Sequence, residues 1–200
     1  MMERNRVIAL SRPTGDGKTY AVVASALALE GVLLFHLPNQ TLAGFMTELL
    51  RKFDADVWNL DTVKIKKEAS ELVKFFKALN KKEGRKNGRC CLIVVCTPRS
   101  LGGEEEQKKY NWCGVFAQLA RNGILKLVVY DEAHLAVQQG LVYRQSEYNR
   151  ISKNFIAKFL KKERRPHILL VDKRCNIVVI SHDYLSMISP FIIMEKNDDG

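Results

Sequence analysis

The chain has 200 residues, enough for one well-packed domain and too few for two full-sized ones. Hydrophobic residues make up 46% and charged residues 27%, as in soluble proteins, and the best apolar stretch, 21–29, is far shorter than the roughly 20 residues of a membrane span. The formal net charge of +10 favours a polyanionic partner, because Lys and Arg displace counterions from phosphates. A solvated basic surface is the alternative.

The N-terminal residues 1–10 carry charges and lack an apolar segment with a small-residue cleavage site, so no secretory signal is expected. The five cysteines form no pair of CxxC motifs, which argues against a disulfide framework or a zinc site. Cys90, Cys91 and Cys96 are expected to be small buried hydrophobic residues. We therefore expect an intracellular protein, nuclear if its source is eukaryotic and cytoplasmic otherwise.

Short apolar segments alternate with longer amphipathic segments along the chain. The pattern predicts strands at 6–11, 32–37, 90–96, 125–130, 168–171 and 177–180, and helices at 17–30, 42–53, 68–79, 115–121 and 145–162. Residues 81–89 and 102–110 are predicted to be charged loops, and 195–200 a disordered tail. This alternation predicts an α/β fold over 1–194, a single domain with a doubly wound, mostly parallel sheet that binds its ligand at the carboxyl ends of the strands.

A phosphate-binding loop is predicted between the first strand and the first helix. Glycines there let backbone N–H groups point at phosphates, Lys18 reaches the terminal phosphates, and Thr19 binds Mg²⁺. Arg12 stands where the strict pattern has Gly, and a chance Gly-Lys-Thr turn is the alternative that the flanking strand and helix disfavour. The residues predicted to bind ATP with Mg²⁺ are Pro13, Thr14, Gly15, Asp16, Gly17, Lys18, Thr19 and Tyr20.

An acidic pair follows the predicted strand at 125–130. Asp131 is predicted to hold the Mg²⁺ through water, and Glu132 to polarise the water that attacks the γ-phosphate. His134 is predicted to connect this site to the nucleic-acid side. Acidic pairs at strand ends can be merely solvated, but their occurrence together with the phosphate loop favours catalysis. We therefore predict Glu132, Asp131 and Lys18 as the catalytic residues.

With both motifs present, the chain resembles the first RecA-like domain of a DExH-box helicase, and most closely the RecQ family, over about 7–171. The resemblance depends on the Asp-Glu-Ala-His sequence at 131–134 and on Gln138, Gly140, Tyr143 and Arg144, which match the family's aromatic-rich loop in spacing. Thr97-Pro98 resembles the family's Thr-Pro-Glu segment, with Arg99 replacing Glu. The segment 37–42 stands where the family has motif Ia, which contacts DNA phosphates.

The resemblance implies a RecA-like P-loop NTPase domain, the ATP-binding half of an ATP-dependent DNA helicase of DNA repair and recombination. It also implies DNA as a partner, single-stranded or at duplex junctions. The residues implied to contact nucleic acid or to couple it to hydrolysis are Thr97, Arg99, His134, Gln138, Tyr143 and Arg144.

The chain also departs from the family. No glutamine motif precedes Arg6, the segment 139–142 differs from the family's aromatic-rich loop, and Asp172-Lys173-Arg174 stands where the family has Thr-Ala-Thr. Nothing after Val171 resembles a second motor domain, which would have to come in trans. Two alternatives therefore stay open: a degenerate module that binds nucleotide and nucleic acid without unwinding, and a P-loop ATPase with a protein partner.

Three isolated residues could suggest further chemistry. Trp58 and Trp112 could stack on bases, but apolar neighbours favour core or half-buried packing. His36, on an apolar strand, is expected to be a core histidine with its polar atoms satisfied.

Overall fold

The computed structural model describes residues 7–11, 20, 23–24, 31–53, 55–63, 69–80, 91–132, 144–159 and 167–172. In this part of the chain, six strands form one sheet in the order β1-β6-β5-β2-β4-β3, and every neighbouring pair is parallel. The strands are β1 (Val7–Ser11), β2 (Gly31–His36), β3 (Asp56–Asn59), β4 (Cys91–Cys96), β5 (Leu125–Tyr130) and β6 (His167–Asp172).

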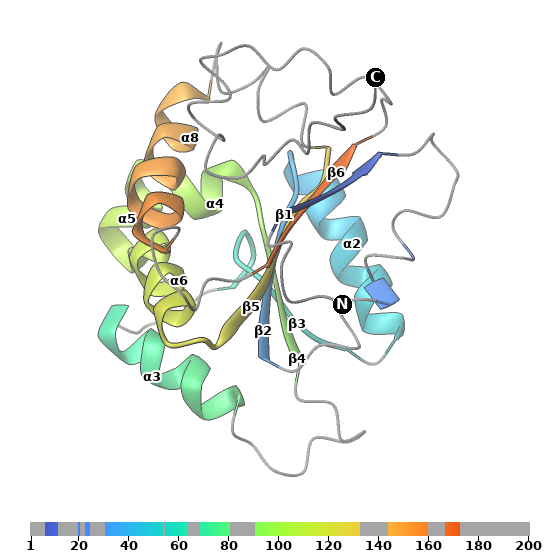
Figure 1. Ribbon diagram of the computed structural model, residues 1–200, viewed down its shortest axis with the longest axis horizontal. Coiled ribbons are helices and arrows are strands. Elements are labelled where there is room, and N and C mark those ends of the chain that lie inside the picture. Colours follow the sequence, from blue (N-terminus) through green and yellow to red (C-terminus); the bar gives the residue numbers. More distant parts are fainter. Residues whose placement is uncertain are drawn as a thin grey trace, which may run out of the picture.

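Helices cover both faces of the sheet, with α2 on one face and the other labelled helices on the opposite face (Figure 1). The helices are α2 (Gln40–Lys52), α3 (Ala69–Asn80), α4 (Pro98–Gly102), α5 (Glu104–Tyr110), α6 (Trp112–Arg121), α8 (Gln145–Ile151), the π-helical turn η1 (Ser152–Ile156) and α9 (Ala157–Phe159). Such a doubly covered parallel sheet is the predicted fold class, which is confirmed.

Each central strand is buried on both faces, because alternate side chains enter different hydrophobic cores. Val32 and Leu34 of β2 face a core rich in aromatic rings from α3, α6 and η1. Leu33 and Phe35 face the core under α2. This arrangement explains the continuous apolar runs of β2, β4 and β5 in the sequence. Trp112 is buried and Trp58 partly buried within the aromatic core, as predicted.

Local sequence sets several boundaries of these elements. The Asn39 side chain caps α2 by accepting a hydrogen bond from Leu42 N at 2.9 Å, and basic residues in the last turn complement the helix dipole. Gly31 opens β2 with φ of 117°, a value that favours glycine, and a Cβ there would lie 2.8 Å from the Ile124 carbonyl oxygen. Only glycine can therefore occupy this first residue of β2 without strain.

Within the described residues, most predicted elements agree with the structure to within a few residues, and four elements differ from the prediction. The predicted loop 102–110 is mainly the helix α5, whose first turn is acidic and last turn basic, a pattern that stabilises a short helix without an apolar stripe. Strand β3 and helix α4 were not predicted, because each is short. The predicted helix 145–162 contains the π-helical turn η1.

Several predictions lie outside the described residues: most of the helix 17–30, the loop 81–89, the strand 177–180 and the tail 195–200. Cys96 is a buried free thiol, as predicted, whereas the side chains of Cys90 and Cys91 are not among those described. Over the described segments, no helix has the length and apolar character needed to cross a membrane.

Candidate functional site

The carboxyl edge of the sheet brings together two chain segments that are distant in sequence. Tyr130, at the end of β5, pairs with Leu170 of β6, which in turn pairs with Ala9 of β1. Strands β1 and β5 are separated only by β6, so they lie about 10 Å apart. Ser11 ends β1 and leads into the predicted phosphate loop. Asp131 is therefore level with the point where that loop leaves the sheet, as a residue that holds a nucleotide's metal must be.

Asp131 and Glu132 form a tight turn directly after β5. The Asp131 N–H donates to the His36 carbonyl oxygen at 3.0 Å, and Asp131 Oδ1 accepts a hydrogen bond from Glu132 N at 3.0 Å. Glu132 has φ of 50°, a left-handed conformation that costs a side-chain-bearing residue roughly 1 kcal/mol. Backbone strain of this kind is concentrated at functional sites. The turn thus ties the backbone of both predicted catalytic residues to the end of β5.

A buried histidine lies beside this turn. His36 is 2% exposed, and its ring centroid is 4.8 Å from that of Tyr130 and 6.0 Å from that of Tyr148. Burial, and secondly the positive charge of Arg144, lower the pKa of His36 to about 3. The imidazole is therefore neutral. His36 is a core residue as predicted, although its Nε2 has no hydrogen-bond partner within the described part of the chain.

Arg144 connects the segment after the acidic pair to the start of α2. Its Nη1 donates to the Pro38 carbonyl oxygen at 3.1 Å. Pro38 directly precedes Asn39, the N-cap of α2. Arg144 was predicted to couple nucleic acid to hydrolysis, and this hydrogen bond brings it against the segment 37–42 before α2.

The Thr97 side chain is buried in the other half of the sheet edge. It is 1% exposed, caps α4, and donates from Oγ1 to Asp61 Oδ1 at 2.9 Å. Its hydroxyl is thus already committed within the protein. Arg99, the second residue of α4, is exposed. The predicted nucleic-acid contact of this segment therefore depends on Arg99 for its charge.

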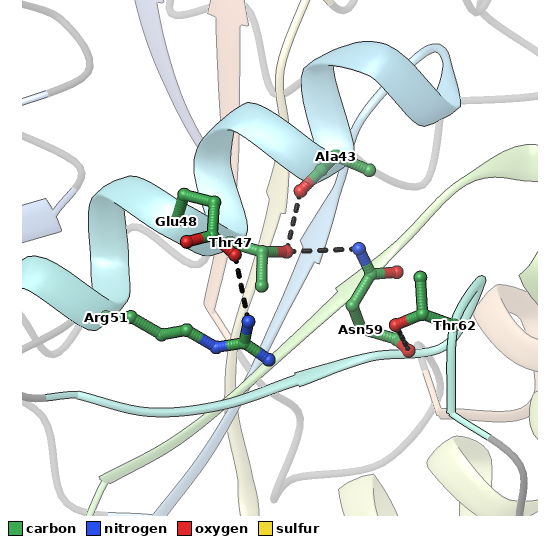
Figure 2. A network of polar contacts seen from close by, with 6 residues as sticks. All are labelled: Ala43, Thr47, Glu48, Arg51, Asn59 and Thr62. Atoms are coloured by element: carbon green, nitrogen blue, oxygen red, sulfur yellow. Dashed lines mark hydrogen bonds and ion pairs between the residues drawn. The ribbon is translucent and has the colours of Figure 1, made fainter.

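Polar residues around β3 were missed by the sequence reasoning. Asn59 Nδ2 donates to Thr47 Oγ1 at 3.1 Å, and Thr47 Oγ1 donates to the Ala43 carbonyl oxygen at 2.6 Å, so the end of β3 is tied to α2 (Figure 2). Asp61, two residues further, binds side chains from α2 and α4. The signal was available in the sequence, since Asn59 and Asp61 flank Leu60 at the end of an apolar segment.

The remaining predicted site residues lie outside the described part of the chain: Pro13, Thr14, Gly15, Asp16, Gly17, Lys18, Thr19, His134, Gln138 and Tyr143. Tyr20 is described, in a helical conformation with 63% of its surface exposed.

The parallel sheet with helices on both faces is the fold of RecA-like helicase domains. The chain belongs to the DEAD/DEAH box helicase family, whose model it matches over residues 1–171. It is therefore a helicase-family ATP-binding domain. No curated protein matches it.

Solved structures with a similar fold include the following three. The helicase domain of Hef from Pyrococcus furiosus is 17% identical with a TM-score of 0.50, over 93% of this chain and 34% of that one. A hypothetical ATP-dependent RNA helicase from Sulfolobus tokodaii is 19% identical with a TM-score of 0.50, over 94% of this chain and 46% of that one. A nuclease-deletion mutant of the Type ISP restriction-modification enzyme LlaGI, in complex with a DNA substrate mimic, is 11% identical with a TM-score of 0.51, over 86% of this chain and 16% of that one. The chain thus spans less than half the length of each.

Proposed function

We propose that this chain is the ATP-binding motor domain of a RecQ-like DNA helicase, which couples Mg²⁺-dependent ATP hydrolysis to strand separation inside the cell. The observation that carries the proposal is the position of Asp131 and Glu132. They follow β5 at the edge where β1 leads into the phosphate-loop sequence. Family membership supports the ATP-binding and helicase parts, while DNA and the RecQ-like type come from the motif resemblance.

The residues fit a role in γ-phosphate hydrolysis. Bound ATP with Mg²⁺ supplies the phosphoanhydride bond and a cation that neutralises its oxygens. Residues 13–19 hold the phosphates, with Lys18 at the terminal ones. Asp131, at the strand end, would hold the Mg²⁺ through water. Glu132 accepts a proton from the water whose oxygen attacks the γ-phosphorus, while the bond to the β-phosphate oxygen breaks to leave ADP and phosphate.

The described contacts also support coupling between nucleotide and nucleic acid. Arg144 follows the segment after the acidic pair and bonds the backbone of Pro38, at the entrance to α2. The first residues of α2, together with Arg99 on α4, form an exposed polar surface at the same sheet edge. We propose that the nucleic-acid backbone binds along this surface through phosphate contacts, consistent with the net charge of +10.

The phosphate-loop assignment is tested by titration calorimetry of Mg²⁺ with ATP. We expect Lys18→Ala to weaken ATP binding severely, because it removes the cation that faces the terminal phosphates. Lys74→Ala, at an exposed position on α3, is a control with the same loss of charge. Equal ATP affinities for the parent and Lys18→Ala would refute the phosphate site.

Steady-state ATPase assays with single-stranded DNA, or with RNA of the same sequence, test ATP hydrolysis and the nature of the nucleic-acid partner. We expect the 200-residue chain alone to turn over slowly, because an arginine inserted by a second motor domain is worth about 10³ to 10⁵ in rate. A stronger effect of DNA than RNA would support the DNA assignment. Binding to neither at low salt would favour an ATPase with a protein partner.

A degenerate nucleotide-binding module is the second candidate. Asp172 ends β6 in register with Ser11, at the place where the helicase resemblance expects a Thr-Ala-Thr motif. ATP binding with no effect of nucleic acid on turnover, even when a second motor domain is supplied in trans, would favour this alternative.

A further inference from the structure

We propose that Asp61 is a positioning residue for nucleic-acid binding, which holds the starts of α2 and α4 in one fixed arrangement. The inference rests on the proposed function, because it assumes that nucleic acid binds at this edge of the sheet. Asp61 itself is not proposed to contact the ligand. It acts through the two segments that it joins.

The Asp61 carboxylate accepts hydrogen bonds from three side chains on two helical segments. Oδ1 accepts from Gln40 Nε2 at 3.2 Å and from Thr97 Oγ1 at 2.9 Å. Oδ2 accepts from Ser100 Oγ at 3.1 Å. Gln40 is the first residue of α2, whereas Thr97 and Ser100 form the capping box of α4. One side chain thus joins two helices that are distant in the sequence.

Asp61 is itself held in place by the end of β3. Its N–H donates to Asn59 Oδ1 at 2.9 Å, and Asn59 is anchored in turn to Thr47 on α2. Thr97, Ser100 and Asn59 are all buried. The carboxylate therefore sits on a rigid support, as a group that orients others must.

The Asp61 carboxylate determines which way the neighbouring hydroxyl groups point. An ionised carboxylate can only accept hydrogen bonds, so the Thr97 hydroxyl points into the protein and not toward a phosphate. The groups left for the ligand are the exposed ones on either side, at the start of α2 and on Arg99 of α4. Their separation depends on Asp61, and a fixed separation lowers the entropic cost of binding a backbone at both.

Charge alone and positioning predict opposite results when Asp61 is replaced. If the carboxylate only repelled nearby phosphates, both Asp61→Ala and Asp61→Asn would strengthen binding. If it positions the segments, Asp61→Ala weakens binding by roughly tenfold because the pre-organised arrangement is disrupted. Asp61→Asn keeps the acceptor for Thr97 and Gln40, and its amide can donate to Ser100 Oγ, so affinity stays near that of the parent.

The experiment is a fluorescence anisotropy titration of the full chain with labelled single-stranded DNA, and with RNA of the same sequence, at several salt concentrations. Glu105→Gln, an exposed carboxylate on α5, is the matched control for loss of charge. Asp61→Ala should also show a shallower salt dependence, by about 0.7 in the logarithmic slope for each phosphate that the variant no longer binds. ATP affinity, measured by calorimetry, should be unchanged.

Ser100→Ala is the second variant, in case Asp61→Ala fails to fold. It removes the hydrogen bond to Asp61 Oδ2 and also the capping bond from Thr97 N, so it should weaken binding in the same direction. Because the two residues share one hydrogen bond, the two changes together should cost less than the sum of their separate losses. Tighter binding by both Asp61→Ala and Asp61→Asn, or parent-like affinity of folded Asp61→Ala, would overturn the positioning role while leaving the proposed function intact. If the parent chain binds neither nucleic acid, the proposed function fails and the positioning role fails with it.

Discussion

Asp61 and Asp131 each follow a strand at the carboxyl edge of the same sheet, yet their surroundings differ. The Asp61 carboxylate accepts hydrogen bonds from side chains of α2 and α4, whereas Asp131 is attached to the sheet by its backbone N–H, bonded to His36 O. The first acid follows the edge strand β3, and two helices begin beside it. The second follows the interior strand β5, two strands from the predicted phosphate loop. Neighbouring elements, and not strand-end position, separate a structural acid from a candidate catalytic one.

The two regions also differ in how their backbones are held. Around β3, polar side chains satisfy one another across α2, β3 and α4. After β5, Glu132 is held at φ of 50°. We expect the contacts around β3 to stabilise the fold and to align α2 with α4. We expect the turn after β5 to lower stability slightly, because its strained backbone positions the candidate catalytic residues.

The largest expected effect comes from Glu132→Gln in the β5 region. Loss of the general base should lower ATP turnover by about 10² to 10⁴, while ATP affinity remains. Steady-state phosphate release measures the rate, and Glu105→Gln controls for loss of a carboxylate. Parent-like turnover in Glu132→Gln would show that Glu132 is not the general base, and that the β5 region does not differ from the β3 region in catalysis.

Phe116→Ala should destabilise the whole domain, and with it both the β3 region and the β5 region. Phe116 is fully buried, and its ring contacts those of Phe76, Trp112 and Phe155. Its truncation should lower the free energy of unfolding by about 3 to 5 kcal/mol. Urea denaturation followed by circular dichroism measures this loss. Phe45→Ala, at a residue 64% exposed, should change stability by less than about 0.5 kcal/mol. Similar losses for the two variants would contradict the packing described.

Asn59→Ala should affect the β3 region alone. It removes the amide that bonds Thr47 Oγ1 and the oxygen that accepts from Asp61 N, so the unfolding free energy should fall by about 1 to 3 kcal/mol. Thr62→Ala in the same turn is the control, because Thr62 is exposed and its hydroxyl donates to the Asn59 backbone carbonyl oxygen, which Asn59→Ala keeps (Figure 2). ATP affinity of the folded variant should equal that of the parent. A stability unchanged from the parent's would show that the polar contacts at β3 are dispensable.

The smallest effect tests the strained turn after β5. At Glu132, the Gly variant should be more stable than the Ala variant by about 1 kcal/mol, because glycine adopts φ of 50° without a Cβ clash. At Glu105, in helix α5, the order should reverse, with Ala more stable than Gly by about 1 kcal/mol. Urea denaturation of the four variants gives both differences. The same order at both positions would mean that Glu132 is not strained in solution.

The sequence by itself determined the central strands and the acidic pair. The apolar runs of β2, β4 and β5 predict buried strands because alternate residues enter two cores, and Asp131 follows directly from the end of such a run. These features are local, so hydrophobic pattern and neighbouring residues are enough to find them. The residues 13–19 were identified in the same way and remain a prediction for this chain.

Only the tertiary structure decided which polar residues hold the sheet edge together. Strand β3 is short and partly exposed, so its pattern is weak, and it is defined by pairing with β4. The contact of Asp61 with Thr97 joins residues 36 positions apart, and Arg144 reaches Pro38 across 106 positions. The motif resemblance predicted that Thr97 contacts nucleic acid, whereas in the fold its buried hydroxyl donates a hydrogen bond to Asp61. Long-range hydrogen bonds of this kind depend on which strands become neighbours, and sheet order is set by packing of the whole domain.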